Sequence, residues 1–512
     1  MNDKIIVTNR KALVEKYGKK EFTMIRKMLK ILQNADQKRG IKSRVVYLDY
    51  DTHMKKTGCK PVKNFSDPRE NKDAIDAIFK HYSPHYLMIL GATDVVPQQD
   101  LKNPLFPAGD DEDEFAFSDL PYACDVPYSQ DASEFIGPTR VVGRLPDLTG
   151  AREPSFVVSL LKTVAGHKTR PGSDYKSHFG LSADVWQKST RLSLNNIFGN
   201  GNQLLRAPPS GPKYPKGQLR NRMHFINCHG AIAMPEFYGE KNKKKPVSLT
   251  YESTKGQIVE GTVAAVECCY GAELYNSIEL TKDPPICQSY LQQRAYGYFG
   301  STTISYGPSD ENGAADLICQ YFLQHVLKGE SIGHATLMAR QQYVENVSEM
   351  DAADLKTLSQ FYLLGDPSVH PITQPKATKI PSDVTGAEAE RFFRTERRQK
   401  MKSTGNFLIR TKATASRKER TGKLSPTIEN KLLKICKLEG LSKRQKFTAF
   451  RVENGLTTSS GLMAKDRKIS LRYLITVGTP VRKVHEKVKR AVAIVAKELN
   501  GRIYGYRIYY QR

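Results

Sequence analysis

The sequence has no apolar run long enough to cross a membrane as a helix, which takes about 20 residues. Its first residues lead directly into an apolar strand pattern and lack the apolar core of a signal peptide. These two absences predict a cytoplasmic protein without a membrane segment.

Cysteine is scarce and follows no known framework. The eight cysteines show no disulfide-type spacing, and the C-x2-C pairs typical of zinc sites are missing. The nearest approach to a metal site would combine Cys228 and His229 with Cys268 and Cys269. Each pair consists of strand neighbours, whose side chains point to opposite faces. We therefore expect a reducing compartment, no metal and no other cofactor.

Negative charge is scarce in the last quarter of the chain. The 512 residues carry a formal net charge of +26. From residue 376 onward there are 34 Lys and Arg against 11 Asp and Glu, a net of +23, whereas the preceding part has 45 against 42, a net of +3. The sequence therefore predicts two or three domains, with a strongly basic module at the C-terminal end.

The first hundred residues alternate between strand and helix patterns. Apolar strands are expected at residues 5–7, 44–48 and 86–90, with amphipathic helices at 22–35 and 71–82 between them. Such alternation predicts an α/β fold with a mainly parallel sheet flanked by helices.

Two further apolar runs end in chemically reactive residues. Residues 223–227 lead into His229 and Gly230, and residues 262–266 lead into Cys269. Buried parallel strands present their carboxyl ends at one edge of a sheet, where α/β proteins place their sites. A thiol needs a nearby base, so the sequence predicts Cys269 as nucleophile and His229 as its base. Main-chain N–H groups of Gly230 and Cys269 are the expected oxyanion donors.

Simpler interpretations compete with this one. A cysteine at the end of an apolar strand is most often inert core, and a lone histidine is often a core residue with satisfied hydrogen bonds. The occurrence of both, each after a strand, favours catalysis. Strand alternation places Glu267 and Cys269 on one face and Cys268 on the other, so Glu267 is the predicted partner of a cationic substrate side chain.

A His-Gly pair after one strand and an acid-x-Cys after the next resembles the caspase–gingipain–clostripain clan of cysteine peptidases. Four phrases resemble the gingipain-like branch: LGATDVVP at 90–97, SDLPY at 118–122, VGRLP at 142–146 and LGDPS at 364–368. The resemblance covers residues 1 to about 375. It implies the caspase–haemoglobinase fold in two subdomains and cleavage of proteins after Arg or Lys.

The resemblance also implies the remaining site residues. Asp184 corresponds to the acid that orients the histidine, or it caps the following turn. The family's own acidic pocket residue has no counterpart here. The loop at 305–311 corresponds to a wall of the pocket for the P1 side chain, with Tyr306 as an aromatic plate. Asp310 is either a second pocket acid or, as we favour, the N-cap of a helix over 314–326.

The charged segments outside this region allow several interpretations. The acidic run at 110–114 is expected to be a solvated loop, with calcium binding and docking of the basic tail as alternatives. Part of the linker at 376–430 is expected to be mobile, because it is rich in charge and poor in apolar residues.

The C-terminal module is expected to be a small basic α+β domain. Strands are predicted at 447–452, 471–477 and 503–510, with a basic amphipathic helix at 481–499. Four tyrosines lie among the basic residues of its last segment: Tyr504, Tyr506, Tyr509 and Tyr510. This pattern suits a nucleic-acid surface, although an acidic partner, or the acidic loop of this chain, is the simpler expectation.

Together these features predict four segments: an N-terminal α/β subdomain at 1–150, a catalytic caspase-like subdomain at 151–375, a basic linker at 376–430 and the basic domain at 431–512. The predicted function is a cytoplasmic cysteine endopeptidase. The alternative is a nucleic-acid-binding or scaffold protein with an incidental peptidase fold.

An enzyme that cuts after basic residues is also expected to process itself. Lys243 and Lys244, between the His and Cys strands, are the best candidates there, because Pro246 follows Lys245. The linker offers further basic sites at 397–398 and 417–420.

Overall fold

The computed structural model describes most of the 512-residue chain, from Asn2 to Arg512. The described residues are 2–109, 111–347, 350–373, 386–412, 417–420, 424–442, 445–451, 471–480, 490–499 and 501–512.

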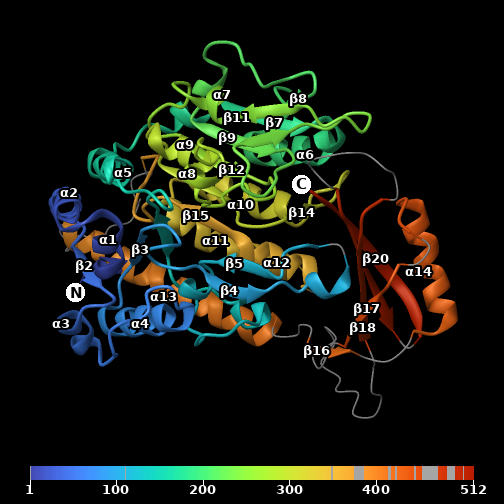
Figure 1. The fold of residues 1–512 in the computed structure, drawn as a ribbon, viewed down its shortest axis with the longest axis horizontal. Coiled ribbons are helices and arrows are strands. Elements are labelled where there is room, and N and C mark those ends of the chain that lie inside the picture. Colours follow the sequence, from blue (N-terminus) through green and yellow to red (C-terminus); the bar gives the residue numbers. More distant parts are fainter. Residues whose placement is uncertain are drawn as a thin grey trace.

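A ten-stranded sheet forms the centre of the molecule (Figure 1). In spatial order its strands are β2 (Ser43–Tyr47), β1 (Lys4–Thr8), β3 (Tyr86–Leu90), β6 (Val142–Leu145), β15 (Phe361–Leu364), β13 (Gly297–Ser301), β12 (Val263–Val266), β9 (Met223–Asn227), β7 (His178–Ala183) and β8 (Leu205–Ala207). Neighbouring strands are parallel except β13 and β15, which are antiparallel at the middle of the sheet. The expected mainly parallel sheet is therefore confirmed.

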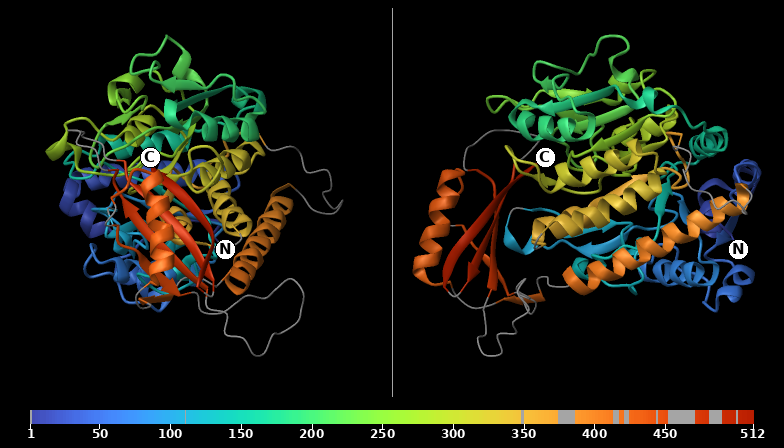
Figure 2. Two further views of the ribbon diagram at one scale, coloured as in Figure 1. Left: turned by 90° about the vertical axis from the view of Figure 1, so that its right-hand side faces the viewer. Right: turned by 180° about the vertical axis from the view of Figure 1, so that it is seen from behind.

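Helices cover both faces of this sheet (Figures 1 and 2). Their bounds are α1 Arg10–Tyr17, α2 Lys19–Lys38, α3 Asp51–Met54, α4 Pro68–Tyr82, α5 Ser155–Gly166, α6 Gln187–Phe198, α7 Tyr251–Thr254, α8 Ser277–Leu280, α9 Ile286–Gln292, α10 Ala315–Leu327, α11 Ile332–Asn346 and α12 Ala352–Gln360. Two short antiparallel pairs, β4 (Gln99–Lys102) with β5 (Phe115–Ser118) and β10 (Glu236–Tyr238) with β11 (Val247–Thr250), lie beside the sheet.

Local sequence explains where these helices form. In α2 the buried residues Phe22, Ile25, Leu29 and Leu32 recur at helical spacing and pack on the sheet. Helix α4 is capped at its N-terminus by Asp67, whose carboxylate accepts two main-chain N–H groups of the first turn. The predicted helices at 22–35 and 71–82 are thus present, each with an earlier start.

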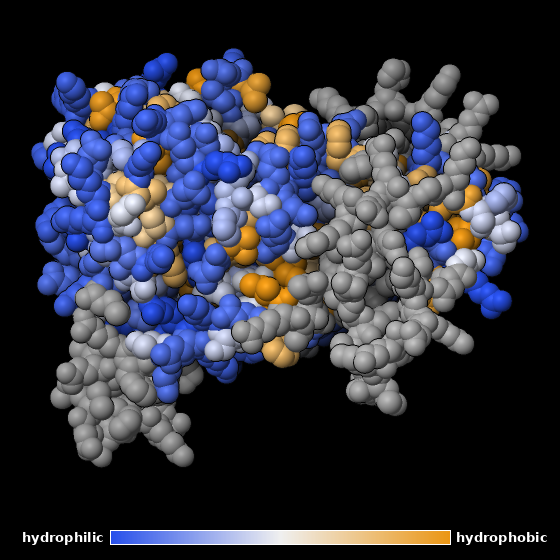
Figure 3. Space-filling view, turned by 90° about the horizontal axis from the view of Figure 1, so that it is seen from below, coloured by the Kyte–Doolittle hydropathy of each residue, from blue (hydrophilic) through white to orange (hydrophobic). Residues whose placement is uncertain are grey.

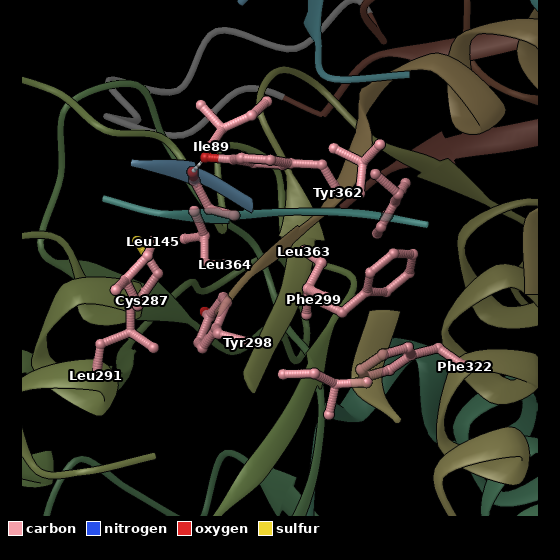
Figure 4. Close-up of a cluster of buried hydrophobic side chains, with 14 of the residues drawn as sticks. Ile89, Leu145, Cys287, Leu291, Tyr298, Phe299, Phe322, Tyr362, Leu363 and Leu364 are labelled. Atoms are coloured by element: carbon pink, nitrogen blue, oxygen red, sulfur yellow. Dashed lines mark hydrogen bonds between the residues drawn. The ribbon is translucent and has the colours of Figure 1, made fainter. Parts of the chain in front are cut away.

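The middle of the sheet is a dense aromatic core, where β13 and β15 meet α9 and α10 (Figure 4). Tyr298 and Phe299 come from β13, and Tyr362 comes from β15. The Tyr298 hydroxyl donates to the carbonyl of Gly271 at 2.9 Å, and the Tyr362 hydroxyl donates to that of Ala272 at 2.7 Å. The core therefore fixes the loop that follows β12.

A second, six-stranded sheet lies beside the first. Its order is β14 (Tyr306–Gly307), β20 (Arg502–Gln511), β19 (Val492–Leu499), β18 (Leu471–Gly478), β17 (Thr448–Arg451) and β16 (Arg417–Arg420). All its described pairs are antiparallel. Helix α14 (Pro426–Leu438) packs on its outer face through Ile428 and Leu432 (Figure 2). Because β14 comes from the main part of the chain, the two parts share this sheet.

One expectation for the C-terminal part is wrong. Residues 492–499, expected at the end of a helix, form strand β19 between β18 and β20, while 481–489 lie outside the described residues. The predicted linker contains helix α13 (Gly386–Lys412), which packs against α11. Strand β19 is stabilised by its pairing with β18 and β20, which the sequence of this segment alone does not indicate.

The described part of the surface seen from below is mostly hydrophilic, with small apolar patches among charged side chains (Figure 3). Among the described residues, no helix is both long and apolar enough to span a bilayer.

Candidate active site

The strand ends predicted to carry the site lie side by side. Strands β9 and β12 are parallel neighbours, with Ile226 opposite Val266. His229 and Cys269 each follow a paired residue by three positions, so the register brings both to the same edge of the sheet. Gly230 lies so close to the Cys269 main chain that a Cβ would be 1.8 Å from the Cys269 carbonyl oxygen. Any larger residue at 230 would separate the two loops.

A returning hairpin supplies the partner of His229. The main-chain groups of His229 and Tyr238 exchange two hydrogen bonds of 2.8 Å. Glu240 lies two residues beyond Tyr238 and therefore on the same side of the extended chain. Its carboxylate is 2.6 Å from His229 Nε2, and both side chains are buried.

This contact determines where the proton sits on the imidazole. Burial would raise the pKa of Glu240, but the hydrogen bond and charge of His229, with Arg490 and Lys245, lower it to about 2. An ionised carboxylate only accepts, so His229 Nε2 carries the proton and donates. Burial lowers the pKa of His229 to about 4 despite Glu240. At neutral pH the ring is neutral, and its Nδ1 lone pair has no hydrogen-bond partner among the described residues.

The Cys269 thiol contacts the loop after β13. Its Sγ accepts the N–H of Ser305 at 3.3 Å, and the thiol lies 3.5 Å from the Ser305 carbonyl, to which it donates. Burial raises the pKa of Cys269 to about 12, although the Ser305 contacts act in the opposite direction. The sulfur is therefore protonated at neutral pH and requires a base to react.

The neighbouring Cys268 has a different environment. Its Sγ accepts the N–H of Cys228 at 3.4 Å, and its side chain belongs to the core of the central sheet. Cys269 instead packs with residues of the second sheet. The two adjacent cysteines thus face opposite sides, as strand alternation predicts.

Two main-chain donors lie beside the thiol. Within the described part of the chain, neither the N–H of Gly230 nor that of Cys269 has a hydrogen-bond acceptor. The chain turns sharply after them, because Tyr270 adopts a left-handed φ of 53°. The Tyr270 N–H is bound by the Thr303 carbonyl at 3.0 Å and does not compete for this place. The free donors are suited to bind an oxyanion.

Arg512 is buried against two acids, Glu267 and Asp316, and the space that its guanidinium occupies is called the acidic pocket below. Arg512 Nη2 donates to Asp316 Oδ2 at 3.0 Å, and Arg512 Nε is 3.9 Å from Glu267 Oε2. All three side chains are fully buried. Burial and the neighbouring Asp316 raise the pKa of Glu267, whereas Arg512 acts in the opposite direction. Asp316 at the shorter distance is therefore the principal counterion.

The walls of the pocket fit a planar cation. The guanidinium carbon of Arg512 lies 4.5 Å from the centroid of the Trp186 ring, within cation–π range. Arg512 Nη2 also donates to the Pro308 carbonyl at 2.7 Å. At Gly307 a Cβ would lie 2.3 Å from Arg512 Nη2, so glycine leaves the room that the guanidinium occupies.

Asp184, predicted to orient His229, is not the acid that contacts it in the structure. The chain turns immediately after β7 in a 3-10 helix at Asp184–Trp186. This turn brings the Trp186 ring to 4.4 Å from the imidazole centroid and leaves Asp184 in ion pairs with Arg206 and Lys241 at 3.4 and 3.5 Å. Glu240 takes the predicted place of Asp184.

Tyr306 and Asp310 also differ from their expected roles. Tyr306 is buried and donates its hydroxyl to Asp111 at 3.1 Å, so its main chain, rather than its ring, meets the strand that carries Arg512. Asp310 is 70% exposed and 3.4 Å from Lys188, away from the pocket. Helix α10 begins after Ala314, without a side-chain cap. Asp310 is therefore neither a pocket acid nor an N-cap here.

The acidic loop is not a purely solvated segment. Asp111 and Asp113 accept from Lys356 at 2.7 and 3.1 Å, and Asp113 also accepts the Ile304 N–H at 2.7 Å. The expectation of a solvated loop is wrong for these two carboxylates, because they form ion pairs with the buried Lys356. Lys356 lies far away in the sequence, so the pattern of the loop alone does not indicate this contact. Their contacts brace the loop after β13 that holds Cys269.

Two residues of the site were missed from the sequence. Glu240 could have been found as an acid that alternates with Tyr238 on a strand returning toward His229. Asp316 could have been found as an acid in the first turn of the helix after β13. Both depend on pairings that single-strand patterns do not encode. No group of three or more His, Cys, Asp or Glu among the described residues is arranged to hold a metal ion.

Comparisons with known proteins add little to this geometry. No family model matches the chain, and no curated protein sequence matches it. A solved structure described as "Structure of Protease" is similar over 99% of this chain and 97% of that chain, with 12% sequence identity and a TM-score of 0.46. The function is therefore inferred from the site itself.

Proposed function

We propose that the protein is a cysteine endopeptidase that cleaves proteins after Arg or Lys, with Cys269 as nucleophile and His229 as general base. The observation that carries this proposal is the meeting of the two loops through Gly230, with Glu240 holding the proton on Nε2 and leaving Nδ1 free. Nδ1, which has no hydrogen-bond partner among the described residues, is the nitrogen that can act as a base. The resemblance to gingipain-like peptidases points to the same residues.

The acylation step follows from the protonation states. His229 Nδ1 accepts the Cys269 proton as the sulfur attacks the scissile carbonyl carbon, and the carbonyl electron pair moves onto oxygen. The N–H groups of Gly230 and Cys269 stabilise that oxyanion. When the intermediate collapses, the C–N bond breaks and the leaving amine takes the proton from His229. While His229 holds the second proton, the negative charge of Glu240 stabilises the imidazolium.

In deacylation, water takes the place of the thiol as the nucleophile. Water attacks the thioester carbonyl while His229 Nδ1 accepts its proton, and the C–S bond then breaks. Cys269 recovers its proton from His229, and the acid product leaves. No atom is needed beyond substrate, water and these side chains.

The acidic pocket supports a basic residue at P1. Glu267, Asp316 and the Trp186 ring lie around the guanidinium of Arg512. A carboxylate buried without a cation carries a desolvation penalty of several kcal/mol. A lysine or arginine side chain of a substrate would remove that penalty, whereas an acidic or apolar one would not.

A peptide-library cleavage profile tests the proposal. Because Arg512 fills the pocket, the profile is taken for both wild type and Arg512→Ala, each with and without Cys269→Ala. We expect cleavage after Arg and Lys that disappears with Cys269→Ala in either background. Cleavage at other residues would contradict the specificity, and cleavage that survives Cys269→Ala would contradict the nucleophile.

The alternative function, a nucleic-acid-binding protein, has less support. Of the four C-terminal tyrosines, Tyr504 and Tyr506 are exposed. Tyr509 is bound to Asp351 and Tyr510 to Glu439, each at 2.9 Å. Two of the predicted stacking platforms are thus already engaged with protein acids.

A further inference from the structure

The last strand of the chain lies on the edge that borders the proposed nucleophile. Strand β20 pairs antiparallel with β14, with Gln511 opposite Tyr306 and Tyr510 opposite Gly307. The Arg512 N–H then donates to the Ser305 carbonyl at 3.0 Å. An extended segment that adds itself to a short exposed strand is a common way for proteins to bind peptides. The C-terminal end meets β14 in Figure 1.

The main chain of Arg512 and the thiol of Cys269 both form hydrogen bonds with the main chain of Ser305. Ser305 donates its N–H to Cys269 Sγ at 3.3 Å, and its carbonyl accepts the Arg512 N–H. The side chain of Arg512 meanwhile enters the pocket of Glu267 and Asp316. A segment with its side chain in a selectivity pocket and its main chain beside the nucleophile is positioned as a substrate would be.

Further contacts hold this strand and its domain against the site. Arg490, at the start of the segment leading into β19, lies 3.1 Å from Glu240, the partner of His229. Arg507 lies 3.1 Å from Asp354 on α12. Tyr509 donates to Asp351 at 2.9 Å, and that carboxylate is also buried. The C-terminal sheet thus contacts both the catalytic and the pocket side of the site.

We propose that Tyr510–Arg512 occupies the substrate-binding edge, with Arg512 in the place of a P1 arginine, so that the resting protein is blocked by its own C-terminal domain. This inference rests on the proposed function for the meaning of P1. The Arg512–Asp316 contact selects for a guanidinium because the group bonds Asp316 and Pro308 together and stacks on Trp186. Asp316 is accordingly the acid that determines specificity.

A purely structural role for Arg512 is the competing explanation. A buried arginine can be retained only to neutralise buried acids at a domain contact. The two explanations differ in what happens when Arg512 is removed. A structural contact would leave only a destabilised protein, whereas a blocked pocket would become available to external cations and substrates.

The test compares Arg512→Ala with the control Arg502→Ala, which removes an exposed arginine from the same strand. The first readout is the thermal shift produced by agmatine, a free guanidinium ligand, which needs no catalysis. The second is kcat/KM for a peptide with arginine at P1. Arg512→Lys is a third variant that keeps the charge if the alanine variant folds poorly.

We expect agmatine to stabilise Arg512→Ala but neither wild type nor Arg502→Ala. An internal ligand acts at an effective concentration near millimolar, so kcat/KM should rise roughly 10- to 1,000-fold in Arg512→Ala. Arg512→Lys should fall between wild type and Arg512→Ala.

Each failure has a separate meaning. Equal kcat/KM in wild type and Arg512→Ala, with equal response to agmatine, would overturn the blocked pocket and leave the peptidase proposal intact. An agmatine response confined to Arg512→Ala, without cleavage by any variant, would overturn the peptidase proposal and keep the occupied pocket. Absence of both cleavage and agmatine binding would overturn both.

Discussion

At the residue scale, the chemistry depends on which nitrogen of His229 carries the proton. Glu240 holds it on Nε2, and the buried Nδ1 is left without a partner among the described residues. The proposed mechanism is therefore general-base catalysis by a neutral imidazole on a protonated thiol, rather than attack by a preformed ion pair.

Replacing Glu240 by glutamine should lower kcat by roughly 100- to 10,000-fold, because the amide no longer fixes the tautomer or stabilises the imidazolium. The pKa of His229 should fall further, since Glu240 raises it against burial. The acid limb of the pH–rate profile, set by His229 near pH 4, should therefore move to lower pH. Activity is retained above that pKa and lost as the ring is protonated below it.

The matched control is Glu236→Gln. Glu236 accepts the hydroxyl of its neighbour Tyr238 and lies in the same hairpin without contacting His229. Similar losses in both variants, or an unmoved acid limb in Glu240→Gln, would contradict the assigned role.

The two adjacent cysteines should behave differently. Cys269→Ala should abolish cleavage, because it removes the nucleophile of the proposed mechanism. Cys268→Ala removes a buried sulfur from the core and should cost about 1 kcal/mol of stability while cleavage continues. Steady-state kinetics and thermal unfolding of both variants check this, and equal loss of activity in two folded variants would contradict it.

The pocket acids should rank by distance from the cation. Glu267→Gln should lower kcat/KM for Arg and Lys substrates by roughly 2–4 kcal/mol, and Asp316→Asn by at least as much. Asp316 lies 3.0 Å from the Arg512 guanidinium and Glu267 lies 3.9 Å away. The variants are compared in the Arg512→Ala background. A larger loss at Glu267 would exchange the two roles, and no loss at either would place the P1 side chain elsewhere.

At the scale of elements, patterns of consecutive residues predicted well those segments that bury themselves locally. The bounds of β3 and β9 coincide with the predicted strands, because both are apolar runs buried on two faces. The pairing of β9 with β12 also follows, since parallel neighbours place their ends at one edge. The mainly parallel sheet, and the placement of the two loops that follow β9 and β12 at one edge of it, were therefore accessible from sequence.

Elements stabilised by distant partners could not be predicted in this way. Strand β19 is buried between β18 and β20, yet its sequence also satisfies a helical pattern. Glu240, Asp316 and the buried acidic loop depend on pairings formed only in the folded chain. The location of Arg512 is not encoded in any local motif.

Self-processing depends on local structure, because a protease needs an extended substrate. Lys243 and Lys244 are exposed in the turn between β10 and β11, whereas Arg397 and Arg398 lie in helix α13. Incubated wild type should therefore lose full-length chain first at Lys243 or Lys244, as measured by intact mass. Cys269→Ala should stay whole. First cuts in α13, or an intact wild type that cleaves peptides, would contradict this prediction.

At the scale of the whole molecule, the nearly neutral main part and the basic C-terminal part meet at the proposed site. The basic side chains Arg490, Arg507 and Arg512 contact the acids Glu240, Asp354 and Asp316 respectively. Part of the C-terminal positive charge thus serves contacts within the chain. Binding of nucleic acid by its exposed residues stays a prediction.

The central claim is that Cys269 and His229 form a peptidase site with a pocket for basic residues. The most direct measurement is intact and peptide mass spectrometry of Arg512→Ala after treatment with an arginyl acyloxymethyl ketone. We predict one adduct, on Cys269, that is suppressed by excess agmatine and absent from Arg512→Ala/Cys269→Ala. An adduct on another cysteine, or none on a folded protein, would contradict the claim.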